Sequence, residues 1–150
     1  MIKLYLLTVG GGEMFKWKED FSVNIENIDE QHKELFRIGN FLYEIVSIKD
    51  GVDRYDEIIE ALHKLGDYAV YHFTFEEKMM EDNGYPKFEQ HKRQHDSFIS
   101  KVKSIDEEEI DERQKKIGMD LIIFIANWIE NHILKTDMEY KEFLNGKGIY

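Results

Sequence analysis

The chain has 150 residues, of which 42% are hydrophobic and 34% are charged, and its net charge is −11 at neutral pH. This length suits one domain with a real core, and the acidic balance argues against nucleic acid as a partner, because phosphate binding requires clustered lysine and arginine. There is no cysteine, which excludes disulfides, iron–sulfur clusters and thiolate zinc sites. A single proline and stretches rich in Glu, Lys, Leu and Ile favour a helical protein.

Residues 1–14 are expected to form a loose N-terminal extension, followed by one domain over residues 15–150. The apolar run at residues 2–7 is far too short to span a membrane. It also lacks the small-residue cleavage pattern of a signal peptide, and glycines at 10–12 follow it. We therefore expect a cytoplasmic protein with no membrane partner.

Two long helices are predicted in the first half of the domain. The first begins near Asn27, where Glu30 three residues later completes a capping box, and it ends at residues 50–51. The second spans about 54–82 and stops before a Gly- and Pro-containing turn at 83–86. Both carry apolar residues at three- and four-residue spacing, which predicts one buried face for each helix.

The second half of the chain predicts two further helices and a short final one. Pro86 suits the first position of the third helix, whose apolar stripe covers 88–102. A polar, acidic connection at 104–111 leads to the fourth helix, which runs over 117–137, and a short final helix is predicted over 138–144. Four long helices with short connections predict an all-α fold, an up-down-up-down antiparallel four-helix bundle with a short C-terminal helix.

Five of the six histidines fall on the apolar stripes, and all four helices contribute. They are His32, His72, His91, His95 and His132. One buried histidine is usually a satisfied core residue. Five in one core would leave ten ring nitrogens needing partners where few exist. The set therefore indicates a metal site.

Two carboxylates are candidates to complete the site. Glu76 lies four residues after His72, on the same helix face, where burying a carboxylate is costly unless it is paired. Asp137 is the second, although its five-residue spacing from His132 places it about 140° away on a regular helix. Asp137 can reach a metal only if the helix widens into a π-type turn or ends there. Asp120, three turns from His132, is the alternative candidate for the second carboxylate ligand.

The ligand types point to iron and to a binuclear site. Imidazole with carboxylate suits iron among the common metals, and seven side chains are too many for one ion and too rich in histidine for calcium or magnesium. The sixth histidine, His63, lies beside the stripe and is interpreted as a surface residue. Glu60 and His63 have the Glu-x-x-His spacing of ferritin-like sites, but that architecture needs two such motifs and only one is present.

Four segments of the chain carry a more specific signal. They are Ile28-Asp29-Glu30-Gln31-His32, His72-Phe73-Thr74-Phe75-Glu76-Glu77, Gly84-Tyr85-Pro86 with His91-x-x-x-His95, and Trp128-x-x-x-His132-Ile133-x-x-x-Asp137. Together they closely resemble the hemerythrins, above all the single-domain bacteriohemerythrins of bacteria and archaea. The resemblance covers about residues 14–143, and all seven ligand positions of the family are filled.

The resemblance implies a cofactor of two non-haem iron ions per chain. His91, His95 and His132 would bind one iron, and His32 and His72 the other.

Glu76 and Asp137 would bridge both ions together with an oxo or hydroxo oxygen, as the family's shared His132 to Asp137 spacing implies. This arrangement leaves one position open on the iron with two histidines. In the family, dioxygen binds there, is held as a hydroperoxide and is released again as dioxygen.

The same resemblance implies an apolar pocket that protects the bound oxygen from protons. The residues expected to line it neighbour the ligands in sequence: Leu35, Phe73, Trp128, Ile129 and Ile133. Apolar residues beside buried ligands can equally be ordinary core, so this alternative stays open.

The function that follows is reversible dioxygen binding for storage, delivery or sensing, without enzymatic activity. A di-iron oxidase or peroxidase is the main alternative, since carboxylate-rich sites favour oxygen activation, whereas five histidines against two carboxylates favour reversible binding. An iron-storage protein is a third possibility. The partners implied are dioxygen and an unidentified oxygen-consuming protein, and the oligomeric state stays open.

Overall fold

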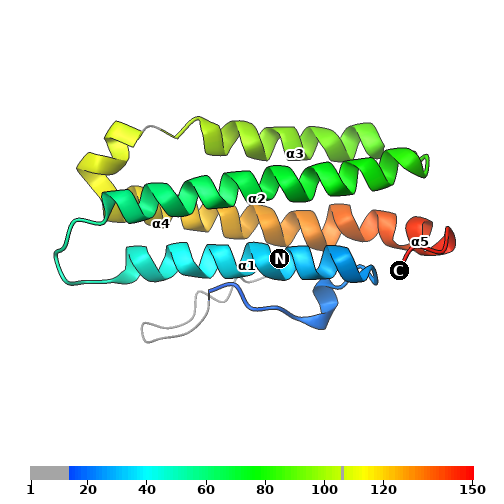
Figure 1. Cartoon of the computed structure of the whole chain (residues 1–150), viewed down its shortest axis with the longest axis horizontal. Helices are drawn as coiled ribbons and strands as arrows, with labels where there is room; N and C mark the ends of the chain where they lie inside the picture. Colours follow the sequence, from blue (N-terminus) through cyan, green and yellow to red (C-terminus); the bar gives the residue numbers. More distant parts are fainter. Residues whose placement is uncertain (1–13, 106) are drawn as a thin grey trace.

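The computed structural model describes residues 14–105 and 107–150 (Figure 1). Its elements are η1 (Glu19–Phe21), α1 (Glu26–Ser47), α2 (Tyr55–Asp82), α3 (Phe88–Lys103), α4 (Glu107–Asn131), η2 (His132–Asp137) and α5 (Met138–Gly146). Figure 1 shows the four long helices lying side by side, with each one running opposite to the next along the chain. The prediction of an all-α four-helix bundle with a short C-terminal helix is therefore confirmed.

Two apolar clusters form the core, one along most of the bundle and one at the end that carries α5. The larger contains Leu35, Phe73 and Ile129 among its buried residues. The smaller one contains Ile28, Met80 and Tyr140, each only three or four positions from a predicted metal ligand. The predicted ligands therefore lie where the two clusters meet.

The start of α1 differs from the prediction. The helix begins at Glu26, its N-cap residue is Ile25, and no side chain caps it. The predicted capping box of Asn27 and Glu30 was wrong, because Asn27 lies inside the first turn of α1 and is not its N-cap residue. Asp29 instead fixes the preceding segment, since its carboxylate accepts hydrogen bonds from the Ser22 hydroxyl (2.5 Å) and the Val23 backbone N–H (2.9 Å).

The end of α1 and the starts of α3 and α4 also differ from their predicted positions. Helix α1 ends at Ser47, before the predicted end at 50–51, whereas α2 has the bounds expected of it. Pro86 is not the first residue of the third helix, because it lies in a turn and α3 begins at Phe88. Most of the connection predicted at 104–111 is helical, since α4 begins at Glu107. Its acidic sequence suits a helix N-terminus, where the helix dipole favours negative charge.

The last helical stretch is continuous but changes its geometry at residues 132–137. Segment η2 is π-helical and joins α4 directly to α5, which confirms the local widening predicted from the His132 to Asp137 spacing. Lys116–Gly146 is long and apolar enough to cross a bilayer by length and composition alone. Its residues Ile122 and Ile125 are nevertheless buried among the other helices, which is the pattern of a core helix in a bundle.

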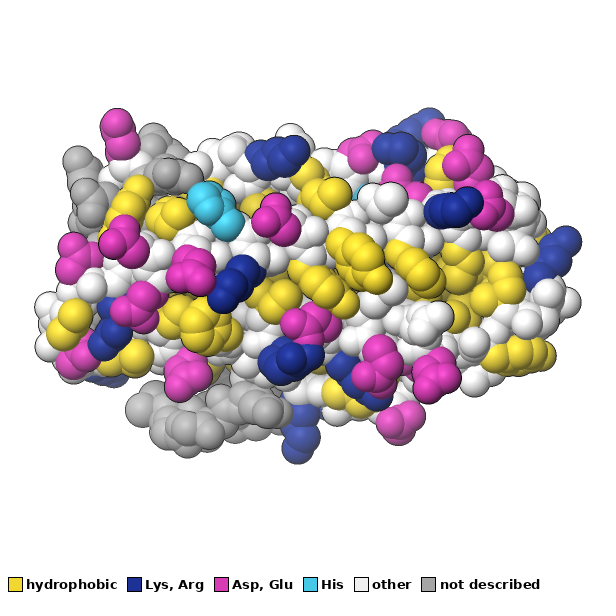
Figure 2. All heavy atoms as spheres, in the orientation of Figure 1, with side chains coloured by type: hydrophobic (Ala, Val, Ile, Leu, Met, Phe, Trp, Pro, Cys, Tyr) yellow, Lys and Arg dark blue, Asp and Glu magenta, His cyan; other side chains and the backbone are white. Residues whose placement is uncertain are grey.

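The surface seen in Figure 2 combines scattered charges with a line of apolar side chains over α1 and α2. The exposed apolar residues of these helices are Phe41, Val70 and Tyr71. Helices α1 and α2 thus present apolar side chains outward as well as towards the core.

Candidate metal centre

All seven predicted ligands are buried and lie close together. They are His32 on α1, His72 and Glu76 on α2, His91 and His95 on α3, and His132 and Asp137 on η2. None is more than 4% exposed. The ligands fall early in α1 and α3, late in α2, and in η2, which directly follows α4, and an antiparallel bundle brings those parts together. The apolar stripes bury them there.

The larger group contains three histidines and both carboxylates. Ligand atoms of Glu76, His91, His95, His132 and Asp137 all lie within 4.8 Å of one another. The Nε2 atom of His132 is 3.0 Å from that of His95 and 3.1 Å from that of His91. Two ligand atoms at right angles around an ion at ~2.1 Å would be separated by about this distance.

A second group contains two histidines and shares a carboxylate with the first. Ligand atoms of His32, His72 and Glu76 lie within 4.8 Å of one another. The Oε1 atom of Glu76 contacts Nε2 of His72 directly and lies 3.5 Å from Nε2 of His32. Both groups therefore depend on Glu76.

Each carboxylate turns one oxygen towards each histidine group. Glu76 faces His32 and His72 with Oε1, while its Oε2 lies 3.4 Å from Nε2 of His91. Asp137 places Oδ2 3.1 Å from Nε2 of His32, and Oδ1 3.0 Å from Nε2 of both His91 and His132. Two carboxylates placed in this way can each contact two metal ions at once.

The π-helical segment explains how Asp137 reaches this position. On a regular helix it would point well away from the face of His132, but the wider turn of η2 puts both side chains on the same side. Asp120, the alternative candidate, is exposed on α4 and lies in neither group. Glu60 and His63 are exposed and lie outside both groups as well.

In the metal-free chain the cluster holds a balanced set of charges. Burial alone would lower the pKa of His32, but its contacts with Asp137 and Glu76 raise that pKa to about 9. The same carboxylates overcome burial and raise the pKa of His91 to about 10. Burial would raise the pKa of both acids, but the neighbouring histidines hold the pKa of Glu76 and of Asp137 well below the usual range. Two protonated imidazoles therefore face two carboxylates.

Several buried polar atoms of the cluster lack a well-formed hydrogen bond. They include both ring nitrogens of His32 and all four carboxylate oxygens of Glu76 and Asp137. Buried polar atoms almost always have a partner, and these oxygens and nitrogens are of the types that iron binds. The donor set therefore fits a pair of metal ions.

Three side chains outside the ligand set orient the histidines. Oε1 of Gln31 lies 2.7 Å from Nδ1 of His72, and Oε1 of Gln94 lies 2.9 Å from Nδ1 of His132. Both amide oxygens are acceptors, so each Nδ1 carries the proton and each Nε2 is free to bind a metal.

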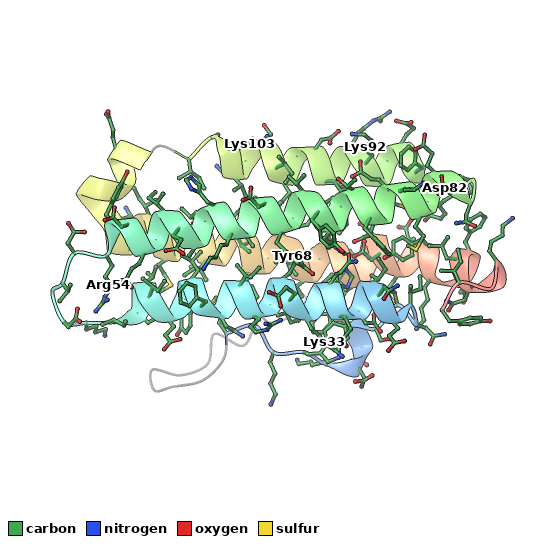
Figure 3. All side chains as sticks on the ribbon, in the orientation of Figure 1. Lys33, Arg54, Tyr68, Asp82, Lys92 and Lys103 are labelled. Carbon is green, nitrogen blue, oxygen red and sulfur yellow. The ribbon has the colours of Figure 1, made fainter. Side chains whose placement is uncertain are left out.

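The third orienting side chain is Glu77, whose Oε2 lies 3.3 Å from Nδ1 of His95. Lys92, labelled in Figure 3, lies 3.6 Å from Glu77 and 3.0 Å from Asp96. Sequence reasoning missed Gln31, Gln94 and Glu77, although each stands directly beside a predicted ligand in the sequence.

The five predicted pocket residues all belong to the larger apolar cluster or pack against it. Leu35, Phe73, Ile129 and Ile133 are buried, and Trp128 is partly buried. The ring of Phe73 stacks on His95 (3.9 Å between centroids), and that of Trp128 stacks on His132 (4.4 Å). Phe73 and Trp128 therefore support the three-histidine group, and the pocket role of the five residues stays a prediction.

Comparison with known proteins agrees with this geometry. Residues 23–144 match the family described as Hemerythrin HHE cation binding domain. Bacteriohemerythrin of Clostridium acetobutylicum is 42% identical over 127 residues, which cover 85% of this chain and 98% of the relative. Myohemerythrin of Theromyzon tessulatum is 33% identical, with coverage of 86% and 92%. A crystal structure of wild-type hemerythrin has a TM-score of 0.70 and 29% identity, with coverage of 86% and 96%. The chain belongs to the hemerythrin family.

Proposed function

We propose that this protein binds dioxygen reversibly at a non-haem di-iron centre, for storage, delivery or sensing. One observation carries the proposal: Glu76 and Asp137 each turn one oxygen to the two-histidine group and the other to the three-histidine group. A carboxylate that binds a single metal ion does not require its two oxygens to face two different groups of histidines. Relatives named bacteriohemerythrin and myohemerythrin support the same function.

The proposed ligand assignment follows the two histidine groups. His91, His95 and His132 would hold one iron, and His32 and His72 the other. Glu76 and Asp137 would contact both ions, and dioxygen would bind on the two-histidine side. When bound in the ferrous state, the two ions supply the electrons with which dioxygen is held reversibly.

The contribution of the chain itself is to orient ligands and exclude water. Gln31 fixes the ring of His72 through Nδ1, so that Nε2 points to the carboxylate Glu76. The two-histidine group lies in the core, where His32 is 0% and His72 is 1% exposed. Leu35, one turn after His32, adds an apolar side chain there. Such surroundings keep protons away and oppose irreversible oxidation of the centre.

An oxygen-uptake experiment on the reduced, iron-loaded protein separates this function from that of an oxidase or peroxidase. A carrier takes up one dioxygen for each pair of irons and returns it when the oxygen pressure falls. With excess reductant present, its uptake stops at that amount. Continuous consumption of oxygen under excess reductant would favour the oxidase.

A further inference from the structure

A groove between α3 and the stretch formed by α4 and η2 reaches the metal centre from the surface. Its volume is about 430 Å³, and the residues relevant here that line it are Arg93, Gln94, Trp128, His132, Lys135 and Thr136. His132 is a proposed iron ligand. The groove therefore joins the solvent to the three-histidine side of the centre.

The floor of the groove is a short stack of rings. Trp128 is partly exposed and lies nearly parallel to His132, with 4.4 Å between ring centroids and 12° between planes. Gln94 accepts hydrogen bonds from Nδ1 of His132 (2.9 Å) and from the Thr136 hydroxyl (2.8 Å). The imidazole is thus held rigidly against an aromatic ring that is itself open to the groove.

The rim of the groove is positive in a chain whose net charge is −11. Arg93 and Lys135 are both exposed, and neither forms an ion pair with any residue that the structure describes. No carboxylate is among the groove's lining residues. Asp96 and Glu139, on the flanking helices, are paired with Lys92 and Lys87 respectively. The groove therefore attracts negative charge, unlike the molecule as a whole.

We propose that this basic groove docks an acidic electron-transfer protein that reduces the metal centre. The inference rests on the proposed function, because only a ferrous pair binds dioxygen and a ferric pair must be reduced before it can do so. In each encounter the donor's redox group loses one electron and one ferric ion becomes ferrous, so two encounters restore the pair.

The route of the electron follows from the ring stack. Electron tunnelling weakens steeply as the distance between donor and acceptor grows. The stacked rings of Trp128 and His132 run from the groove to the proposed iron, so an electron donor docked in the groove would lie close to the metal. The two-histidine side offers no comparable approach through His32 or His72, which are at most 1% exposed. Long-range attraction between the positive rim and an acidic donor raises the rate of productive encounters.

The test uses the iron-loaded protein, oxidised and mixed anaerobically with reduced flavodoxin as the acidic one-electron donor. A charge-reversed variant, Arg93→Glu with Lys135→Glu, is compared with the matched control Lys49→Glu with Lys116→Glu. The control changes the net charge equally, at exposed sites after the end of α1 and in the first half of α4 that do not line the groove. We expect the second-order reduction rate of the groove variant to fall by about tenfold or more at low salt, and to lose most of its salt dependence. The control should stay within about twofold of the parent.

Two further measurements distinguish loss of docking from damage to the metal centre. A small neutral reductant, tetramethyl-p-phenylenediamine, should reduce all three proteins at the same rate if the centre is intact. Binding of oxidised flavodoxin to the oxidised proteins, measured without electron transfer, should weaken only in the groove variant. Equal losses in both variants, or no loss in either, would overturn the docking surface. An iron count on the same samples tests the proposed function separately, and the binding measurement decides the docking surface even if that count is low.

Discussion

Glu76 belongs to both ligand groups, and its two oxygens face different histidines. Replacing it with glutamine keeps its volume but removes the negative charge and one of the two oxygen donors. We expect Glu76→Gln to reduce the iron content from two per chain to one or fewer. Glu81→Gln, at an exposed position on the same helix, should retain both ions. Normal iron content in Glu76→Gln, measured by metal analysis after purification, would disprove the ligand assignment.

His32 and His91 make the stability of the metal-free chain depend on pH. Their pKa values are raised to about 9 and about 10, whereas an unfolded histidine titrates near ~6.5. Their protonated forms therefore stabilise the fold fully below ~6.5, and this contribution is lost as the pH rises through 9 and 10. The urea midpoint of the metal-free protein should fall steadily between pH 7 and pH 10. A constant or rising midpoint would show that the two imidazoles are not paired with Glu76 and Asp137.

Ile129 tests whether the apolar residues beside the site protect bound oxygen. It is 2% exposed and lies one turn before Ile133 on the helix that carries His132. Ile129→Ala should speed oxidation of the oxygenated protein to its inert form, because it opens space for water near the centre. Ile125→Ala, at a position 1% exposed and one turn farther from the ligands, is the matched control. Both variants should lose about 2–5 kcal/mol of unfolding free energy. Equal oxidation rates in the two variants would therefore show that Ile129 is an ordinary core residue that does not protect bound oxygen.

Among the secondary-structure elements, η2 is the one that serves the site directly. A π-helical segment behaves as an α-helix with one inserted residue, which suggests a deletion experiment. Removing Lys135, which is exposed, should let the segment return to α-helix and keep His132 and the aspartate on one face. Removing the exposed Asn127 from regular α4 should instead rotate both ligands by about 100° relative to the rest of the bundle. The first variant should keep its iron and the second should lose it. The opposite result would mean that the π geometry does not serve to align Asp137.

The middle of each helix was easier to predict than its ends. Helix α2 has its predicted bounds because a long periodic pattern is interrupted by turn residues on both sides. The start of α1 was mispredicted because Asp29 bonds to the segment before the helix, a contact that the local sequence cannot reveal. Helix α3 begins after Pro86 for a similar reason, since the backbone N–H of Phe88 bonds to Tyr85 within the turn. The π widening was predictable because two polar residues five apart had to share one face.

For the molecule as a whole, the position of the site follows from the sequence more fully than its surroundings do. Five histidines on apolar stripes could meet only in the core, and the antiparallel order of the helices brings them to one end. The orienting residues could not be predicted in this way. Gln94 bonds to a histidine 38 positions away, and its exposed place on α3 resembles any other solvated position. The basic groove was hidden for the same reason, because Arg93 and Lys135 come together only in the folded chain.

The claim that two irons here hold dioxygen reversibly is tested most directly by optical titration of the reduced protein with oxygen, with iron counted in the same sample. The arrangement of Glu76 and Asp137 between the two histidine groups predicts two irons per chain. Reversible oxygen binding by these irons predicts a charge-transfer band that appears with oxygen and disappears on degassing. Two irons that oxidise irreversibly would contradict reversible binding, and fewer than one iron per chain would contradict the site itself.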